Sequence, residues 1–185
     1  RWRFGLKGHP TRRIVFDTAI MSHPDSDHYK GFEALFDSGQ FTCRTLYHNG
    51  ILERTGDDVD GLGELNASRD RLLSVFADRA SCEAHVNNPA LVGKGMLARV
   101  MRKGLERAER VRMLSASDRW VPGFGADATV SMEVLAPVLD DEGGRPAYRL
   151  FGPRGRQKGP TKNGHSIVLK LTYGGVTMLL GGDLN

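Results

Sequence analysis

The hydrophobic pattern of the chain predicts short strands, and the first of them leads directly into a polar cluster. Residues 14–21 form an apolar, β-branched run that is typical of a buried strand. Apolar residues at helical spacing over 29–39 predict a helix that ends near a glycine. Residues 42–47 resemble another short strand, and Asn49-Gly50 is a turn signal.

The middle of the chain has the patterns of a loop and of two helices. Residues 53–68 are acidic and rich in glycine, which predicts a surface loop. The apolar spacing predicts one helix over 68–80, with Ser68 as its N-cap, and a second over 88–111. Arginines and lysines run along the second helix, and a solvated cationic face is favoured over a nucleic-acid site.

The last third of the chain predicts β structure. Residues 132–138 are strand-like and contain a proline, which favours an edge or a strand end. Residues 140–162 are polar and rich in Gly, Pro and Arg, which predicts a loop. The apolar runs 166–173 and 176–180 flank Gly174-Gly175 and predict a β-hairpin.

Composition indicates one ordinary globular domain over 1–185. The chain is 39% hydrophobic and 26% charged, and its net charge of +4 is compatible with a phosphate-bearing substrate. Cys43 and Cys82 form no metal or disulfide motif, which favours the cytoplasm. Residues 1–13 are basic and irregular, as in a connecting loop. We expect no membrane-spanning segment and no signal peptide, and the start at Arg1 rather than Met suggests a fragment.

The polar cluster after the first strand carries the candidate chemistry. His23, Asp25, Asp27 and His28 lie within six residues. Four candidate metal ligands on one tight turn predict a metal-binding loop between a strand and a helix. Ser26 or Asp27 could cap that helix, and its free backbone N–H groups would favour anionic groups.

Asp183 is the second candidate anchor of the site. It follows an apolar strand and two glycines, which let the backbone approach another segment closely. A carboxylate at such a strand end needs a partner, and a metal held by the first turn would supply it. His165 is either a ligand or a second-shell or surface residue, whereas surface positions are expected for His48 and His85.

These motifs resemble those of a known superfamily. The motif His23-Pro24-Asp25-Ser26-Asp27-His28 is similar to the His-x-His-x-Asp-His turn of the metallo-β-lactamase superfamily, with Asp25 in place of the second histidine. The form that begins Ser-His-Pro-Asp resembles the branch that contains the metallo-hydrolase domain of bacterial competence (DNA-uptake) proteins. That branch is also matched by Val134-Leu135-Ala136-Pro137 and by Asn163-x-x-Ser166-Ile167-Val168-Leu169, followed by Gly182-Asp183.

The resemblance covers residues 19–36 and 132–184 and implies a fold. That fold is an α/β protein, the αββα sandwich of the superfamily. The chain ends at Asn185, before the late histidine of the superfamily, so the resemblance implies an incomplete domain. The remaining middle, 53–128, is then expected to be a helical insertion.

The resemblance also implies a role for each motif residue. His23 and Asp25 would bind one metal ion, Asp27 and His28 would bind a second as catalytic residues, and Asp183 would bridge them. The expected cofactors are two divalent ions, zinc first and manganese as the alternative, which hold a hydroxide as the nucleophile. At the third motif Asn163 aligns with the branch, and His165 is an additional candidate ligand.

Three functions follow from these expectations. The first is a metal-dependent hydrolase of a phosphodiester, with nucleic acid or a nucleotide as substrate. The second is a hydrolase of a small ester, lactone or thioester on the same fold. The third is a non-catalytic module that binds metal weakly. The competence-type resemblance also allows a periplasmic domain in place of the cytoplasmic location.

Overall fold

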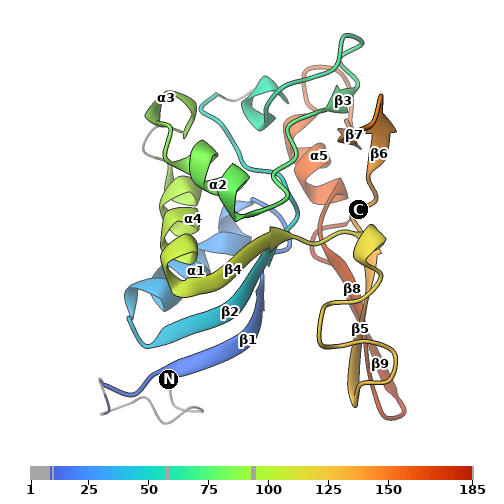
Figure 1. Cartoon of the computed structure of the whole chain (residues 1–185). Helices are drawn as coiled ribbons and strands as arrows, with labels where there is room; N and C mark the ends of the chain where they lie inside the picture. Colours follow the sequence, from blue (N-terminus) through green and yellow to red (C-terminus); the bar gives the residue numbers. More distant parts are fainter. Residues whose placement is uncertain (1–8, 10, 57–58, 93–94, 185) are drawn as a thin grey trace.

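A computed structural model describes residues 9, 11–56, 59–92 and 95–184 (Figure 1). In this part of the chain the fold is mixed α/β, with five α-helices and three small sheets. Most of the basic segment 1–13 lies outside the described residues. The elements in chain order are β1 (Ile14–Ile20), α1 (Ser26–Asp37), β2 (Phe41–His48), β3 (Arg71–Leu72), α2 (Arg79–Val86), α3 (Pro89–Val92), α4 (Met96–Arg107), β4 (Ala108–Met113), β5 (Val130–Ala136), β6 (Asp140–Glu142), β7 (Arg145–Arg149), α5 (Lys158–Gly164), β8 (Val168–Tyr173) and β9 (Val176–Leu180).

A parallel sheet forms the first half of the fold. Its strand order is β1-β2-β4, and α1 and α4 pack against one of its faces (Figure 1). Leu46 of β2 and Val111 of β4 join Phe36 and Met101 of these helices in one buried apolar cluster. The register pairs the last residue of β1 with Tyr47 near the end of β2. The carboxyl ends of the two strands therefore lie at the same edge of the sheet.

An antiparallel sheet of order β5-β8-β9 forms the second half. The predicted hairpin is confirmed: β8 and β9 pair directly, and Gly174 in the connecting turn has a φ of 56°. In Figure 1, β9 runs from the hairpin turn toward the C-terminus, which lies at the opposite end of this sheet. A smaller sheet has the order β3-β7-β6, and two of its strands, β6 and β7, lie in the segment 140–162, which was expected to be a loop. That loop prediction is wrong, because β6 and β7 fall within the segment and α5 begins in it.

The helix predictions for the middle of the chain are largely wrong. Residues 71–72 pair with β7, so no helix runs over 68–80. The next helix, α2, starts at Arg79, because Asp78 and Ser81 form a reciprocal capping box there. The predicted helix 88–111 divides into α3 and α4 and ends at Arg107, after which the chain pairs with β2 as the strand β4. Local periodicity does not detect such a pairing, because the partner strand is distant in sequence.

These elements also change the picture of segment 53–128. It holds α2, α3 and α4, but it also supplies β3 and the edge strand β4 of the parallel sheet. The segment 53–128 thus contains both helices and strands, and its interpretation as a helical insertion within one domain stays a prediction. The mixed α/β class is confirmed, whereas the αββα sandwich stays a prediction. Within the described ranges, no helix combines the length and the apolar character that crossing a membrane requires.

Two histidines that were expected at the surface are buried. His48 is 1% exposed and His85 is 3% exposed. The Nδ1 atom of His48 accepts a hydrogen bond of 3.0 Å from the Gly50 backbone N–H, and its Nε2 atom lies 3.3 Å from the Cys82 sulfur. The neutral ring is thus held between a loop and α2, where burial lowers the pKa of His48 to about 4.

This burial predicts a loss of stability in mild acid. Between about pH 6.5 and about pH 4 the unfolded chain binds a proton at His48 and the native chain does not. Stability that is complete above pH 6.5 should therefore fall by up to roughly 1.4 kcal/mol per pH unit from this group. Urea unfolding at a series of pH values gives the free energy of unfolding. In His48→Asn this free energy should fall less steeply with decreasing pH than in the wild type. The exposed His9 provides the control: a His9→Asn variant that flattens the slope equally would contradict this assignment.

Candidate metal centre

The turn after β1 is bonded to both the parallel sheet β1-β2-β4 and the antiparallel sheet β5-β8-β9. The Met21 backbone N–H donates to the Tyr47 carbonyl at 2.9 Å, and the Ile167 N–H donates to the Ser22 carbonyl at 2.9 Å. One bond joins the turn to the parallel sheet and the other joins it to the start of β8. His23 follows immediately, and His28 lies in the first turn of α1, which begins at Ser26. Asp25 is the N-cap residue and its side chain makes no capping bond, so neither Ser26 nor Asp27 caps this helix.

The end of β9 reaches the same place through a glycine. Gly182 has a φ of 56°, and a Cβ atom there would lie 2.8 Å from the Ser166 Cβ and 3.4 Å from the Ser22 Cβ. Only glycine fits this backbone and this approach without displacing its neighbours. The next residue, Asp183, is thereby brought against the histidine turn.

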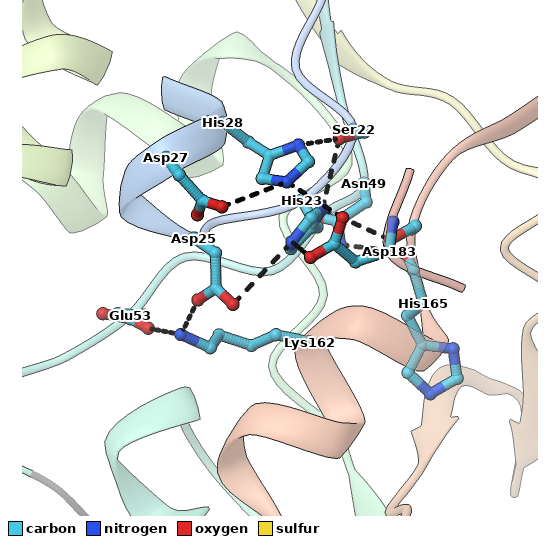
Figure 2. A network of polar contacts seen from close by, with 11 residues as sticks. Ser22, His23, Asp25, Asp27, His28, Asn49, Glu53, Lys162, His165 and Asp183 are labelled. Atoms are coloured by element: carbon cyan, nitrogen blue, oxygen red, sulfur yellow. Dashed lines mark hydrogen bonds and ion pairs between the residues drawn. The ribbon is translucent and has the colours of Figure 1, made fainter. Parts of the chain in front are cut away.

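Three of the predicted ligands converge at this point: His23, His28 and Asp183 (Figure 2). The His28 Nε2 atom lies 3.0 Å from Asp183 Oδ1, and the His23 Nε2 atom lies 4.0 Å from Asp183 Oδ2. The three ligand atoms all lie within 4.8 Å of one another. Donor atoms that share one tetrahedral zinc ion are about 3.4 Å apart, so these separations match a single ion site.

Hydroxyl groups orient both imidazoles. The Nδ1 atom of His23 lies 3.1 Å from the Ser22 hydroxyl and 3.3 Å from the Ser166 hydroxyl. The Nδ1 atom of His28 lies 3.3 Å from the same Ser22 hydroxyl. If both Nδ1–H groups donate to these oxygens, both Nε2 atoms present lone pairs toward Asp183. Such bonds from the non-ligating nitrogen are how proteins fix metal-binding histidines.

Burial makes His23 suited to a metal ion. Its side chain is fully buried, and among the described residues no group forms a hydrogen bond with its Nε2 atom. Desolvation, with a smaller contribution from the charge of His28, lowers the pKa of His23 and keeps the ring neutral. A buried polar atom without a partner is costly, and a divalent ion would supply that partner. Imidazole and carboxylate donors suit zinc and also suit manganese.

Asp25 lies beside this group but has other partners. One of its oxygens pairs with the ammonium of Lys162 on α5, and Lys162 also lies 2.6 Å from Glu53 Oε1. The side-chain amide of Asn163, oriented by its neighbours, donates to the other Asp25 oxygen at 3.1 Å. That oxygen is 3.8 Å from His23 Nε2. Burial would lower the pKa of Lys162, but its bonds to the two carboxylates raise it, so the ammonium is charged.

Asp27 and His165 also lie outside the convergent group. The Asp27 side chain is 76% exposed, and its Oδ2 atom lies 3.7 Å from His28 Nε2. His165 points away from the centre in Figure 2 and is 3% exposed. Its Nε2 atom lies 2.8 Å from the Arg149 carbonyl, and its ring packs on Tyr148 and Phe151. His165 is therefore a core residue bonded to the backbone, and the structure does not bring it to the metal ligands.

Among the described residues, one group of candidate ligands converges where two metal ions were expected. The second ion and the ligand roles of Asp25 and Asp27 stay predictions. Sequence patterns did not identify the orienting roles of Ser22 and Ser166, although both residues flank motif positions. They gave no indication of Lys162 or Glu53, because each reaches the site from a distant segment.

Comparison with protein-family models, with curated proteins and with solved structures found no match. The resemblance to the metallo-β-lactamase superfamily therefore rests on the motifs of this sequence alone. Membership in that superfamily stays a prediction.

The geometry predicts which side chains control metal affinity. Removal of a ligand in His23→Ala or Asp183→Asn should weaken zinc binding by more than about 100-fold, and Ser166→Ala should weaken it by roughly 10- to 100-fold. Asp27→Asn is the matched control and should change affinity least, because its side chain is exposed and lies outside the group. Competition titration with a zinc chelator measures these values. A loss in Asp27→Asn as large as that in Asp183→Asn would contradict the three-residue assignment.

Proposed function

We propose that this chain is a metal-dependent hydrolase of phosphodiesters, related to the competence-type branch of the metallo-β-lactamase superfamily. The convergence of His23, His28 and Asp183, with both Nε2 atoms turned toward the carboxylate, is the observation that carries the proposal. Nucleic acid is the favoured substrate class. Zinc or manganese is the cofactor that this donor set suits.

The residues of the chain have separate tasks in this proposal. His23, His28 and Asp183 hold the ion, while Ser22 and Ser166 hold the two imidazoles in orientation. A bound divalent ion polarises a phosphoryl oxygen and lowers the pKa of water, so that water can act as the nucleophile near neutral pH. Water would add to phosphorus as the bond from phosphorus to the leaving oxygen breaks, and a proton from the water would pass to that oxygen, which gives a phosphomonoester and an alcohol. Neither serine is needed as a nucleophile, because both hydroxyls are placed to accept bonds from the histidines.

Two adjoining cavities favour a phosphate-bearing substrate. A cavity of about 480 Å³ is bordered by Ser22 and Gly182, next to the metal ligands. A second cavity, of about 530 Å³, shares Asp17, Thr18 and Phe124 with the first. The shared residues show that the two cavities adjoin. We refer to the pair as the concavity; its lining includes Ser22 and Gly182, the sequence neighbours of His23 and Asp183, but none of the three ligands.

The far end of this concavity is cationic. It is lined by Arg44, Arg110 and Arg112, on the face of the parallel sheet that the helices leave open. Arg112 pairs with Asp118 at 2.5 Å, and Arg44 pairs with Asp17 at 3.4 Å. Arg110 forms no ion pair within the described part of the chain. Guanidinium groups bind phosphates in bidentate fashion, so a nucleic-acid backbone is the substrate that this charge complements.

A small ester, lactone or thioester is the second candidate substrate class. The cavity nearest the metal centre is lined mainly by apolar side chains, among them Ile20, Met132 and Leu169. Such a lining would accept an acyl chain. Parallel assays on bis-p-nitrophenyl phosphate and on a panel of lactones separate the two classes. Faster turnover of the lactones would replace the phosphodiester proposal.

The proposed activity should depend on the ion and on its ligands. Chelation should abolish hydrolysis of single-stranded DNA, and added zinc or manganese should restore it. His28→Ala and Asp183→Asn should each lower kcat/KM by at least about 100-fold, because each removes a group that holds the ion. Full activity in both variants would refute the proposal. A chain that binds metal but hydrolyses neither substrate class would instead be the non-catalytic module.

The cationic end of the concavity predicts a separate effect on DNA binding. Arg110→Glu should weaken binding of a single-stranded oligonucleotide to the metal-free protein roughly tenfold. It should also lower the slope of the logarithm of the binding constant against the logarithm of salt concentration by about one. Arg107→Glu is the matched control, because Arg107 lies on α4, which covers the other face of the sheet. Fluorescence anisotropy over a salt series measures both. Equal losses of DNA affinity in the two variants would indicate a general effect of net charge and would contradict DNA binding at the cationic end of the concavity.

A further inference from the structure

Lys162 lies beside the metal ligands as a nearly buried cation. Its side chain is 11% exposed, and its ammonium contacts Asp25 from the histidine turn and Glu53 from the segment after β2 (Figure 2). Three segments distant in sequence therefore meet at this one nitrogen. An exposed lysine on a helix needs no such arrangement, because water solvates it at little cost.

The partners of Asp25 argue against its use as a metal ligand. One of its oxygens accepts from Lys162, and the other accepts from Asn163 at 3.1 Å. A metal ion would have to compete with both donors for this carboxylate. The group of His23, His28 and Asp183 needs no such exchange, because His23 Nε2 has no hydrogen-bond partner among the described residues.

The ammonium keeps a donor for a further group. A lysine has three N–H donors, and within the described residues the side chains of Asp25 and Glu53 accept two of them. The third is left for an oxygen that enters the site. A positive charge fixed by two carboxylates changes its position little when an anion binds, which is the condition for effective electrostatic stabilisation.

We propose that the centre holds one divalent ion, on His23, His28 and Asp183, and that Lys162 is its second cation and binds an anionic oxygen of the substrate. This inference rests on the proposed phosphodiesterase function. Asp25 and Glu53 are then positioning residues, which hold the ammonium beside the ion. The lysine takes the place that the family resemblance assigns to another metal ion.

The first test is the number of ions bound by the wild-type chain. Titration with zinc or manganese, followed by elemental analysis, should give one ion per chain. Two tightly bound ions would overturn this inference and leave the proposed hydrolase in place. No bound ion would refute the proposed function itself. This count does not depend on the folding of any variant.

The second test is binding of inorganic phosphate to the ion-loaded protein by calorimetry. Lys162→Met should weaken phosphate binding roughly 10- to 100-fold, the loss expected for one hydrogen bond between charged groups. Metal affinity should stay within about threefold of the wild type, because Lys162 contacts none of the three ligands. Lys162→Arg should retain most of the phosphate affinity, because it keeps the charge.

Lys158→Met is the matched control on the same helix. Its ammonium bonds to the Gly56 carbonyl at 2.7 Å, away from the metal ligands, so phosphate binding should not change. Thermal unfolding confirms that each variant is folded. Should Lys162→Met fail to fold, Glu53→Gln replaces it, since loss of one anchoring carboxylate should also weaken phosphate binding. Unchanged phosphate affinity in a folded Lys162→Met, or in Glu53→Gln if that variant is used, would overturn the role of Lys162.

Discussion

The buried imidazole of His23 is the feature on which the centre depends. One side of the ring meets the hydroxyls of Ser22 and Ser166, and the other side presents a nitrogen without a hydrogen-bond partner among the described residues. Burial of an unpaired polar atom costs roughly 1–3 kcal/mol. With His28 and Asp183 beside it, this nitrogen belongs to a group that could hold a metal ion, which would satisfy it.

The histidine turn joins the sheet β1-β2-β4 to the sheet β5-β8-β9, and the two sheets also share a buried apolar cluster. Backbone bonds connect Met21 to the parallel sheet and Ser22 to the antiparallel sheet. Gly182 then lets the end of β9 approach both serines. The site thus lies at the junction of two independently paired sheets, and it depends on their relative position. A shift of either sheet would separate Asp183 from the histidines.

Charge divides the surroundings of the centre into two regions. Close to the ligands, the two carboxylates of Asp25 and Glu53 outnumber the single ammonium of Lys162 that pairs with both. Farther along the concavity, Arg110 and its neighbouring arginines supply positive charge on the open face of the sheet. The arginine region is the part of this surface whose charge complements the anionic substrate proposed above.

Local sequence patterns predict the elements that depend on near neighbours in the chain. The strand before the histidine turn, the helix that follows it and the hairpin at residues 168–180 were predicted from periodicity and turn residues. The ligand types were also readable, because His23 and His28 lie on one short turn. Asp183 was inferred from its strand end and its glycines. These features depend on neighbours within a few residues, which a single sequence displays.

The tertiary structure decided everything that depends on distant partners. The segment 68–80 is not a helix because Leu72 pairs with Tyr148, and β4 is a strand because β2 lies beside it. His165 turns into the core because Tyr148 and Phe151 pack on its ring. Lys162 reaches Asp25 across more than one hundred residues of chain, and no local pattern records that contact. Packing and ion pairing join residues that are distant in sequence. Residue spacing therefore predicts the candidate ligands, but it does not predict which neighbours contact each of them in the fold.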